Sequence, residues 1–331
     1  MSIIFLDFGE KMEKTLLSFI IPCYRGGETI ERVIDEIIET VAEREQYDYE
    51  IICVNDCSPD NEYEVIRGLA EKNFKIKLVD FVRNMGKHTA VLAGYSFVKG
   101  EYVIDLDDDL QCPVNEVWRL IEPLERDECD VASAKYAEKK ESFIKRFGSN
   151  VNFRMGNILL DKPKNIRMEN FTAKKLFVCK EMAKYSGSYP YLEGLIYRVT
   201  KRIVMVDMEE RERGDSKKTG FTFRKSLSLW LNGMTAFSVK PLRIASVSGC
   251  VFALIGFIWA LIVVIRKLAH PEVPMGYSSI MAVILFSNGL IMLMLGLVGE
   301  YLGRTYISVN EYPQYIIRDT LNLEEDQYDI F

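Results

Sequence analysis

Histidine is scarce in this chain of 331 residues, which contains only His88 and His270. A histidine base or metal ligand is available at few positions, so carboxylates must carry most of the acid, base or metal chemistry. The seven cysteines are odd in number and include no CxxC pair, which argues against a disulfide framework and fits a reducing compartment. Cys53 and Cys57 could be metal ligands, but no second pair completes a zinc site.

Strongly basic blocks are also absent from the first 200 residues, and the net charge is -6. A nucleic-acid partner is therefore excluded, because neutralising phosphates needs clustered lysine and arginine. The chain has no GxxxxGK[ST] loop and no GxGxxG after the first strand, which excludes the usual NTPases and dinucleotide-binding proteins. The N-terminus carries acids inside its apolar stretch and lacks a cleavage site, so it is not a secretory signal.

Apolar strands alternate with amphipathic helices over the first 135 residues. The first strand is expected to start near Leu16, and apolar residues recur at helical spacing in the segment that follows, residues 30–41. This alternation predicts an α/β fold with a parallel-type sheet that helices cover on both faces. Ligands of such sheets bind beyond the carboxyl ends of the strands. That rule selects three loops, Pro22–Gly27, Asn55–Asn61 and Asp107–Pro113.

The third of these loops places Asp107, Asp108 and Asp109 directly after an apolar strand. Adjacent carboxylates repel each other, and a hard cation such as Mg²⁺ or Mn²⁺ would relieve the repulsion. In extended backbone Asp107 and Asp109 share one direction and Asp108 points away. Since Mg²⁺ binds through one or two carboxylates plus substrate phosphates, the loop implies a diphosphate ligand. A solvated acidic turn is the alternative.

Two apolar segments near the C-terminus, Ile244–Ile265 and Tyr277–Val298, contain no charged residue. At about 1.5 Å per residue each spans the roughly 30 Å hydrocarbon layer, so they predict a transmembrane hairpin. Two buried core helices are the alternative. More lysine and arginine residues flank the outer ends than lie in the turn, which favours a cytoplasmic body and a multi-pass protein of the inner membrane.

The order of four motifs resembles the glycosyltransferase family 2 catalytic domain: IPCYRGGETI, VNDCSPDN, RNMGKHTAVLAGY and DLDDDLQCP. The hairpin followed by LVGEYLGRTYISVNEYPQYII is similar to the polyprenyl-phosphate subgroup, which includes the undecaprenyl- and dolichyl-phosphate glycosyltransferases. The resemblance implies a GT-A fold and inverting transfer from a UDP- or GDP-sugar. It gives an N-terminal extension (1–15), a catalytic domain (16–222), juxtamembrane amphipathic helices (223–243), two transmembrane helices (244–303) and a cytoplasmic tail (304–331).

The resemblance assigns six residues to nucleotide binding: Pro22, Tyr24, Asp56, Arg83, Asn84 and Lys87. Asp56 would hydrogen-bond the base, although it could instead stabilise the turn before Ser-Pro-Asp. Arg83 could equally be an ordinary surface charge. The resemblance further implies that Asp107, Asp109 and Gln111 hold the metal and the diphosphate, with Asp107 also contacting the nucleotide.

The segment RERGDSKK resembles a phosphate-contacting loop of these enzymes, in which Arg211, Ser216 and Lys217 would contact donor or acceptor phosphates. The expected catalytic residues are Asp107 and Asp109, through the metal that they would hold, and Arg211. Cations at these positions would stabilise charge on a leaving diphosphate. A basic turn that binds lipid headgroups is the alternative.

Several positions depart from the family pattern. Arg25, Gly26 and Gly27 stand where many relatives have Asn-Glu-Glu, and Cys57 replaces a glycine. Residues 167–171 stand where many relatives have Gly-Asp-Phe-Arg, so the acceptor-side aspartate is missing or replaced by Glu169 or Asn170. The general base therefore stays unassigned.

The sequence predicts an enzyme that moves a sugar from a nucleotide-sugar to a polyprenyl phosphate, undecaprenyl phosphate above all, beside the lipid bilayer that holds it. A phosphate acceptor is already ionised near neutral pH and needs little deprotonation. A saccharide hydroxyl acceptor would need a base, for which Glu193 is the candidate. A non-catalytic nucleotide-binding membrane scaffold is a further alternative. The partners expected are donor, acceptor and bilayer, with a possible homo-oligomer.

Overall fold

The computed structural model describes residues 14–136, 168–187, 190–209, 211, 240–269, 276–309 and 313–323. These residues fall into two compact units. The first unit holds the described residues up to 211 together with those from 313 onward, and the second holds the two long C-terminal helices.

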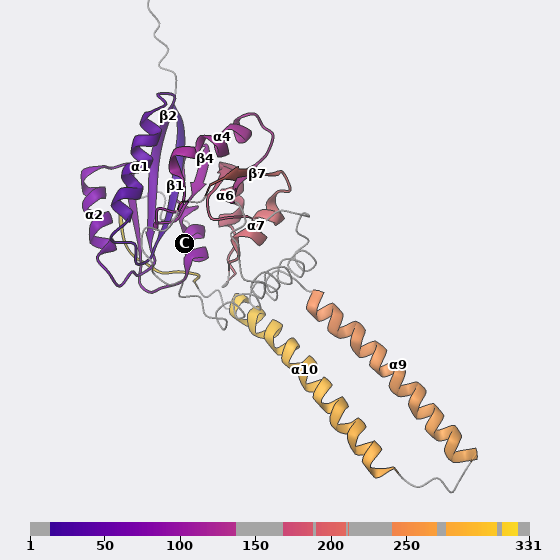
Figure 1. Cartoon of the computed structure of the whole chain (residues 1–331). Helices are drawn as coiled ribbons and strands as arrows, with labels where there is room; N and C mark the ends of the chain where they lie inside the picture. The colour runs from indigo at the N-terminus through magenta and orange to yellow at the C-terminus, as the bar shows by residue number, and fades with distance from the viewer. Residues whose placement is uncertain are drawn as a thin grey trace, which may run out of the picture. The chain divides into compact units, whose positions relative to one another are not determined.

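The first unit is built on a mixed sheet (Figure 1). The strand order is β7-β5-β6-β4-β1-β2-β3-β8. The strands are β1 (Thr15–Cys23), β2 (Tyr47–Asn55), β3 (Ile76–Phe81), β4 (Tyr102–Asp105), β5 (Val131–Tyr136), β6 (Thr172–Lys175), β7 (Ile203–Met208) and β8 (Ile317–Leu321). Strands β1 to β4 pair in parallel, as the alternation of strands and helices predicts. The sheet differs from a purely parallel one because β6 runs antiparallel to β4 and β8 antiparallel to β3.

Helices cover both faces of this sheet. They are α1 (Ile30–Ala42), α2 (Glu62–Lys72), α3 (Lys87–Gly94), the short 3-10 helix η1 (Val114–Glu116), α4 (Trp118–Glu125), α6 (Leu176–Ala183) and α7 (Leu192–Val199). On β1, Phe19 and Ile21 join the core cluster that contains the apolar side of α1. Ile20 faces the other layer, where a Cβ on Gly94 would lie 2.8 Å from its Cγ2 atom. Because both faces are covered, apolar side chains point to both faces of β1.

Strand β6 brings a distant part of the chain to the carboxyl end of β4. In the antiparallel register, Asp105 at the end of β4 pairs with Thr172 at the start of β6. The residues just before β6 therefore lie beside the acidic loop that follows β4. This placement shapes the site.

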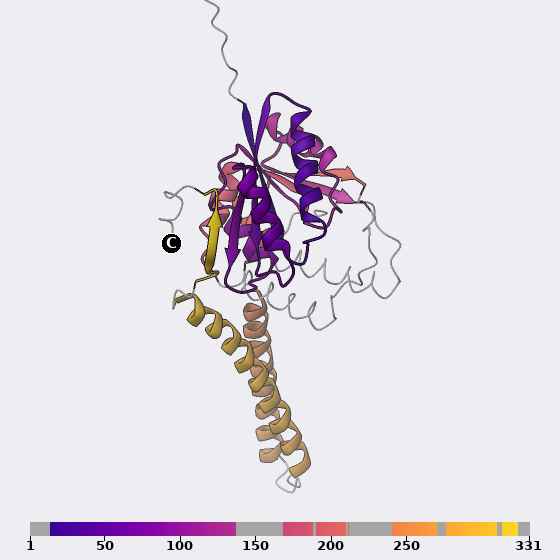
Figure 2. The ribbon, with the colours of Figure 1, turned by 90° about the vertical axis from the view of Figure 1, so that its left-hand side faces the viewer.

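Strand β8 comes from the segment expected to be a cytoplasmic tail, and it forms the sheet edge beside β3 (Figure 2). The Tyr315 ring stacks on Phe81 at 5.1 Å, and Arg318 donates to the Val82 carbonyl at 2.9 Å. The Asn322 side chain donates to the carbonyls of Ala70 and Ile76. The long helices are thus an insertion between two strands of one sheet, β7 and β8.

The second unit contains α9 (Lys240–Ala269) and α10 (Tyr277–Val309), which contact each other through Phe252 and Phe286 at a ring distance of 6.1 Å. Within the described residues, one 18-residue window, Phe286–Gly303, is long and apolar enough to cross a membrane, and a shorter apolar stretch covers Ala245–Trp259. Large apolar side chains in both helices are exposed. That exposure disagrees with a pair of buried core helices.

Candidate active site

Four loops meet at the carboxyl ends of β1 to β4, and each holds its shape with a residue of positive φ. These residues are Arg25 (66°), Cys57 (54°), Gly86 (88°) and Leu110 (63°). A positive φ is uncommon outside glycine, and strained backbone of this kind clusters at functional sites. Cys57 occupies one such left-handed position, which a glycine would adopt without strain.

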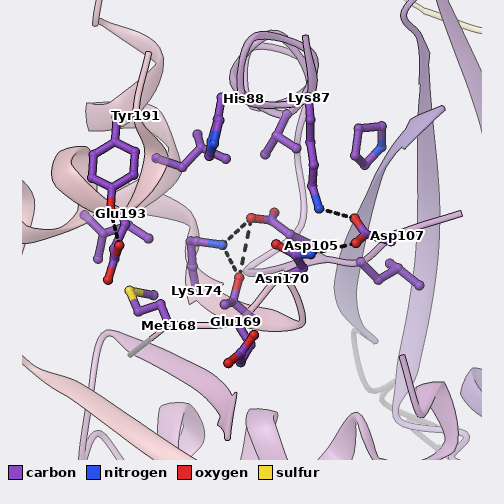
Figure 3. Close-up of a pocket in the computed structure, with 16 residues that line it drawn as sticks. Lys87, His88, Asp105, Asp107, Met168, Glu169, Asn170, Lys174, Tyr191 and Glu193 are labelled. Carbon is purple, nitrogen blue, oxygen red and sulfur yellow. Dashed lines mark hydrogen bonds and ion pairs between the residues drawn. The ribbon is translucent and has the colours of Figure 1, made fainter. Parts of the chain in front are cut away.

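The acidic loop divides its carboxylates between two directions. Asp107 accepts from the Lys87 ammonium, and its other oxygen accepts from the Asn170 amide at 2.8 Å (Figure 3). Asp108 instead accepts from the Tyr24 backbone N–H at 3.0 Å. The expected divergence of Asp107 and Asp108 is therefore present. Asn170 thus contacts the acidic loop directly, and Glu169 lines the same cavity, so both remain candidates for the missing aspartate.

Burial of Asp108 next to Glu62 raises the pKa of both carboxyl groups. Glu62 also accepts from the Gly26 backbone N–H at 3.1 Å. A Cβ on Gly26 would lie 2.5 Å from Asp108 Oδ2 and 2.7 Å from Glu62 Oε1. The departure from Asn-Glu-Glu thus has a steric account, because the Glu62 carboxylate fills the space at Gly26.

Asp109 and Gln111 lie farther along the same loop, where the Gln111 backbone N–H donates to Asp109 Oδ1 at 3.2 Å. The backbone N–H of Arg211 donates to the Gln111 carbonyl at 3.2 Å. Its guanidinium, however, contacts Glu36 at 2.7 Å and Asn115 at 2.5 Å. A phosphate role for Arg211 stays a prediction, and Ser216 and Lys217 lie outside the described residues.

Oxygen ligands at this edge fit a hard cation. Asp107 already binds a cationic group, the Lys87 ammonium, so the position suits positive charge. Among the described residues no group of three or more His, Cys, Asp or Glu side chains is arranged to hold a metal. Mg²⁺ and Mn²⁺ sites that include substrate phosphates need only one or two carboxylates, so Asp107, Asp109 and the Gln111 amide oxygen remain the predicted ligands.

Asp56 connects two of the loops. Its carboxylate accepts from the backbone N–H groups of Met85 at 2.6 Å and Gly86 at 2.8 Å, and its carbonyl accepts from the Asn84 side chain at 3.2 Å. Burial raises its pKa although both backbone bonds oppose the shift. Asp56 therefore holds the loop that begins α3, rather than the turn that follows it. A hydrogen bond from Asp56 to the nucleotide base stays a prediction. Nucleotide binding by Arg83 also stays a prediction, and its side chain is exposed and contacts Met85.

A cavity opens beside the acidic loop, and four of the predicted site residues line it: Pro22, Lys87, Asp107 and Glu193. Glu193 is fixed there, because it accepts from the hydroxyls of Tyr191 and Tyr197. Burial and this carboxylate raise the pKa of both tyrosines, so both hydroxyls stay protonated donors.

Several residues of this cavity were not expected from the sequence. Lys174 on β6 forms an ion pair with Asp105 on β4 at 2.5 Å, and both side chains line the cavity (Figure 3). His88 on α3 faces it beside Tyr191. Burial lowers the pKa of His88 to about 4, with the Lys87 charge as a second cause, so the imidazole is neutral near pH 7. The available signal was Asp105, a charged residue in the otherwise apolar strand YVID.

The cavity thus joins a carboxylate suited to a metal-bound diphosphate with polar groups suited to a sugar, on a sheet of the GT-A type. Residues 18–183 match the glycosyl transferase family 2, and residues 240–305 match the GtrB C-terminal hairpin. The chain belongs to glycosyl transferase family 2, in the subgroup of polyprenyl-phosphate glycosyltransferases, and is a glycosyltransferase.

Relatives of this chain align over nearly its whole length. It is 32% identical to the undecaprenyl-phosphate 4-deoxy-4-formamido-L-arabinose transferase of Yersinia enterocolitica, over 96% of this chain and 97% of that protein. It is 28% identical to the prophage bactoprenol glucosyl transferase homolog of Escherichia coli, over 91% of this chain and 98% of that protein. The putative glycosyltransferase CsbB of Bacillus subtilis is 30% identical, with 93% of each chain covered.

A solved structure shows the same fold. Glucosyl-3-phosphoglycerate synthase from Mycobacterium tuberculosis, crystallised with Mn²⁺, uridine diphosphate and phosphoglyceric acid, superposes with a TM-score of 0.50. The identity is 18%, and the match covers 66% of this chain and 75% of that chain. This likeness supports the GT-A fold of the first unit.

Proposed function

We propose that this glycosyltransferase moves a sugar from a UDP- or GDP-sugar to a polyprenyl phosphate, with undecaprenyl phosphate as the principal candidate, at the cytoplasmic face of the inner membrane. The single observation that carries the proposal is the joining of a family 2 domain to a hairpin of exposed apolar helices. An isoprenoid acceptor is confined to the bilayer, so an enzyme that uses it must work at the interface. Relatives named as undecaprenyl-phosphate and bactoprenol transferases support the acceptor class.

The hairpin would cross the bilayer twice, with α9 and α10 as the two spans. The chain leaves the sheet after β7 and returns to it at β8, so both ends of the hairpin connect to the same unit. An even number of crossings keeps those two ends on one side of a membrane. A multi-pass arrangement therefore agrees with the connectivity of the sheet.

In the proposed reaction, an oxygen of the lipid phosphate attacks the anomeric carbon while the nucleoside diphosphate leaves from the opposite face. A Mg²⁺ or Mn²⁺ ion on Asp107, Asp109 and Gln111 would neutralise charge on the diphosphate. Lys87 lies against Asp107 and would move to a donor phosphate when the cation is bound. The acceptor phosphate has its second pKa near 6 and is largely ionised at neutral pH, so it needs no strong base.

Glu193 favours a second candidate, transfer to a saccharide hydroxyl. Two tyrosine hydroxyls orient its carboxylate at the cavity, and a hydroxyl acceptor needs a base. The two candidates differ in what Glu193→Gln should do. If the acceptor is a phosphate, we expect Glu193→Gln to change kcat and its pH dependence little. If the acceptor is a hydroxyl and Glu193 is its base, we expect kcat to fall by about 10²-fold or more.

The deciding experiment incubates the full chain in detergent with Mg²⁺ or Mn²⁺, radiolabelled UDP- and GDP-sugars and undecaprenyl phosphate. We expect one donor to label the lipid, and we expect a chelator to abolish the transfer. A parallel reaction offers a saccharide acceptor instead. If no donor labels the lipid while a saccharide is labelled, the second candidate replaces the first, and if nothing is labelled the non-catalytic scaffold becomes the better description.

A further inference from the structure

Two residues that line the same cavity each carry a buried side-chain atom with no hydrogen-bond partner within the described ranges. Among the described residues, four buried side-chain atoms have no hydrogen-bond partner: Glu62 Oε1, His88 Nδ1, Asp105 Oδ1 and Trp118 Nε1. His88 and Asp105 both line the cavity beside the acidic loop. Buried polar atoms are almost always paired, and an unpaired one is costly. Two of them at one cavity therefore point to a polar ligand.

The surroundings of Asp105 leave one oxygen for that ligand. The Lys174 ammonium and the Tyr95 hydroxyl both contact Oδ2 at 2.5 Å, and the Thr172 hydroxyl lies 3.4 Å from the same atom. Oδ1 receives no bond. The side chain of Lys174 is 1% exposed, so its buried positive charge compensates the Asp105 carboxylate at Oδ2. The arrangement holds Oδ1 as a fixed hydrogen-bond acceptor.

Register explains why this acceptor is rigid. Thr172 pairs with Asp105 across the β4–β6 ladder, and Lys174 lies two residues along the same face of β6. Both residues belong to strands of the central sheet rather than to loops. Polar groups on strands are placed more reproducibly than polar groups on loops, which suits discrimination between similar ligands.

His88 supplies the second group, from a different element. It is the second residue of α3, next to Lys87, and its ring lies edge-on to Tyr191 at 6.0 Å. Burial keeps the imidazole uncharged near neutral pH. A neutral ring nitrogen hydrogen-bonds a hydroxyl without adding charge to the site.

We propose that Asp105 Oδ1 and His88 Nδ1 bind the transferred sugar of the donor and determine which sugars the enzyme accepts. The inference deepens the proposed function and rests on it. The group facing Asp105 must donate a hydrogen bond, so the sugar carries a hydroxyl, amino or amide N–H group there. A sugar with a deoxy position would leave Asp105 unpaired, and a uronic acid would place a second carboxylate against it.

The test compares the affinity of a nucleotide-sugar with that of its nucleoside diphosphate, in the full chain with Mn²⁺. The probes are UDP, UDP-glucose, UDP-N-acetylglucosamine, UDP-glucuronate, GDP, GDP-mannose and GDP-fucose, measured by calorimetry. We expect at least one neutral or amino sugar to improve affinity over its own nucleotide. UDP-glucuronate should bind no better than UDP, and GDP-fucose, a 6-deoxy sugar, reports whether the missing hydroxyl is the one that Asp105 contacts.

Asp105→Asn should remove that improvement, by roughly tenfold or more, and change the affinity for the nucleoside diphosphate by less than about twofold. The matched control is Asp130→Asn, because Asp130 is equally buried and bonded to Thr200 and Arg202 but does not line the cavity. It should leave both affinities unchanged. An improvement that survives in Asp105→Asn, or a loss that extends equally to the nucleotide alone, would overturn the subsite.

His88 gives a second pair of variants should Asp105→Asn fold poorly. His88→Ala removes the ring nitrogen, whereas His88→Asn places an amide near the Nδ1 position. We expect the sugar-dependent gain to fall severalfold in His88→Ala and to return in His88→Asn. Equal behaviour of the two variants would contradict a hydrogen bond from His88. If the unaltered chain bound neither UDP nor GDP, the proposed function itself would be wrong, which is distinguishable from loss of the sugar-dependent gain alone.

Discussion

The central sheet and the C-terminal hairpin contain the same apolar residue types, but their exposure differs. In β1, Phe19 and Ile20 are 0% exposed, whereas Phe257 in α9 and Met292 in α10 are both 69% exposed. Large exposed apolar patches on a protein surface normally mark contact with a partner or a membrane. The sheet buries its apolar side chains with its own helices, while the apolar side chains of the hairpin are left uncovered by the part of the chain that the structure describes.

Charged residues differ between the two regions in the opposite sense. The sheet places Asp105, Lys174 and Asp107 inside or at the end of buried strands, and each has a specific polar partner. The apolar segments Ile244–Ile265 in α9 and Tyr277–Val298 in α10 contain no charged residue. We therefore expect the sheet to carry out catalysis and the hairpin to determine membrane association. Substitutions in one region should change one of these properties and leave the other unchanged.

The largest effect should come from Asp107→Asn, which removes the charge that the predicted cation and Lys87 share. We expect kcat to fall by about 10²- to 10³-fold, with the location of the protein in membranes unchanged. Lipid labelling at saturating donor measures the first property and membrane fractionation the second. Asp207→Asn is the control, because Asp207 on β7 is exposed and forms a surface ion pair with Lys135 at 2.8 Å, away from the cavity lining. Activity retained in Asp107→Asn would remove this carboxylate from the mechanism.

The next effect concerns Ile255, which is exposed near the middle of α9. Ile255→Arg should impair membrane insertion, because arginine at the centre of a spanning helix costs about 2.5–3.5 kcal/mol. Ile255→Leu should behave like the unaltered chain. Fractionation and thermal unfolding of the catalytic unit are measured on the same samples. Normal insertion of Ile255→Arg would mean that α9 does not span the bilayer.

A change in acid stability should follow from His88, whose folded pKa of about 4 lies below its unfolded value near 6.5. Between pH 6.5 and pH 4, His88 is protonated in the unfolded chain but neutral in the folded chain. The free energy of unfolding therefore falls as the pH drops toward 4. The loss is bounded at about 3 kcal/mol, and the contribution is fully present above pH 6.5. Thermal unfolding from pH 7.5 to 4.5 should show a shallower decline in His88→Asn. Equal slopes would place the His88 pKa near its ordinary value.

The sequence was sufficient for the parts of the site that obey local rules. The strand-end rule selected the loop of Asp107, the family resemblance pointed to Lys87, and both side chains line the cavity. Asp105 and Lys174 were missed because they are 69 residues apart and meet through the antiparallel register of β4 and β6. Alternation of strands and helices predicts parallel neighbours, so it gave no indication that β6 reverses direction. Strand β8 was missed for a similar reason, since it pairs with β3 across the whole hairpin.

The smallest effect should come from Asn322, which joins the returning segment to the sheet. Its side-chain amide donates to Ala70 O at 2.7 Å and Ile76 O at 2.8 Å, and its φ is 63°. Asn322→Ala loses both bonds and strains the backbone, whereas Asn322→Gly loses the bonds but tolerates the positive φ. We expect local destabilisation of about 1–2 kcal/mol in the alanine variant and less in the glycine variant. Faster hydrogen exchange confined to β8 would support this, and exchange that also rises throughout β1 and β2 would mean that the sheet core depends on the strand that follows the hairpin.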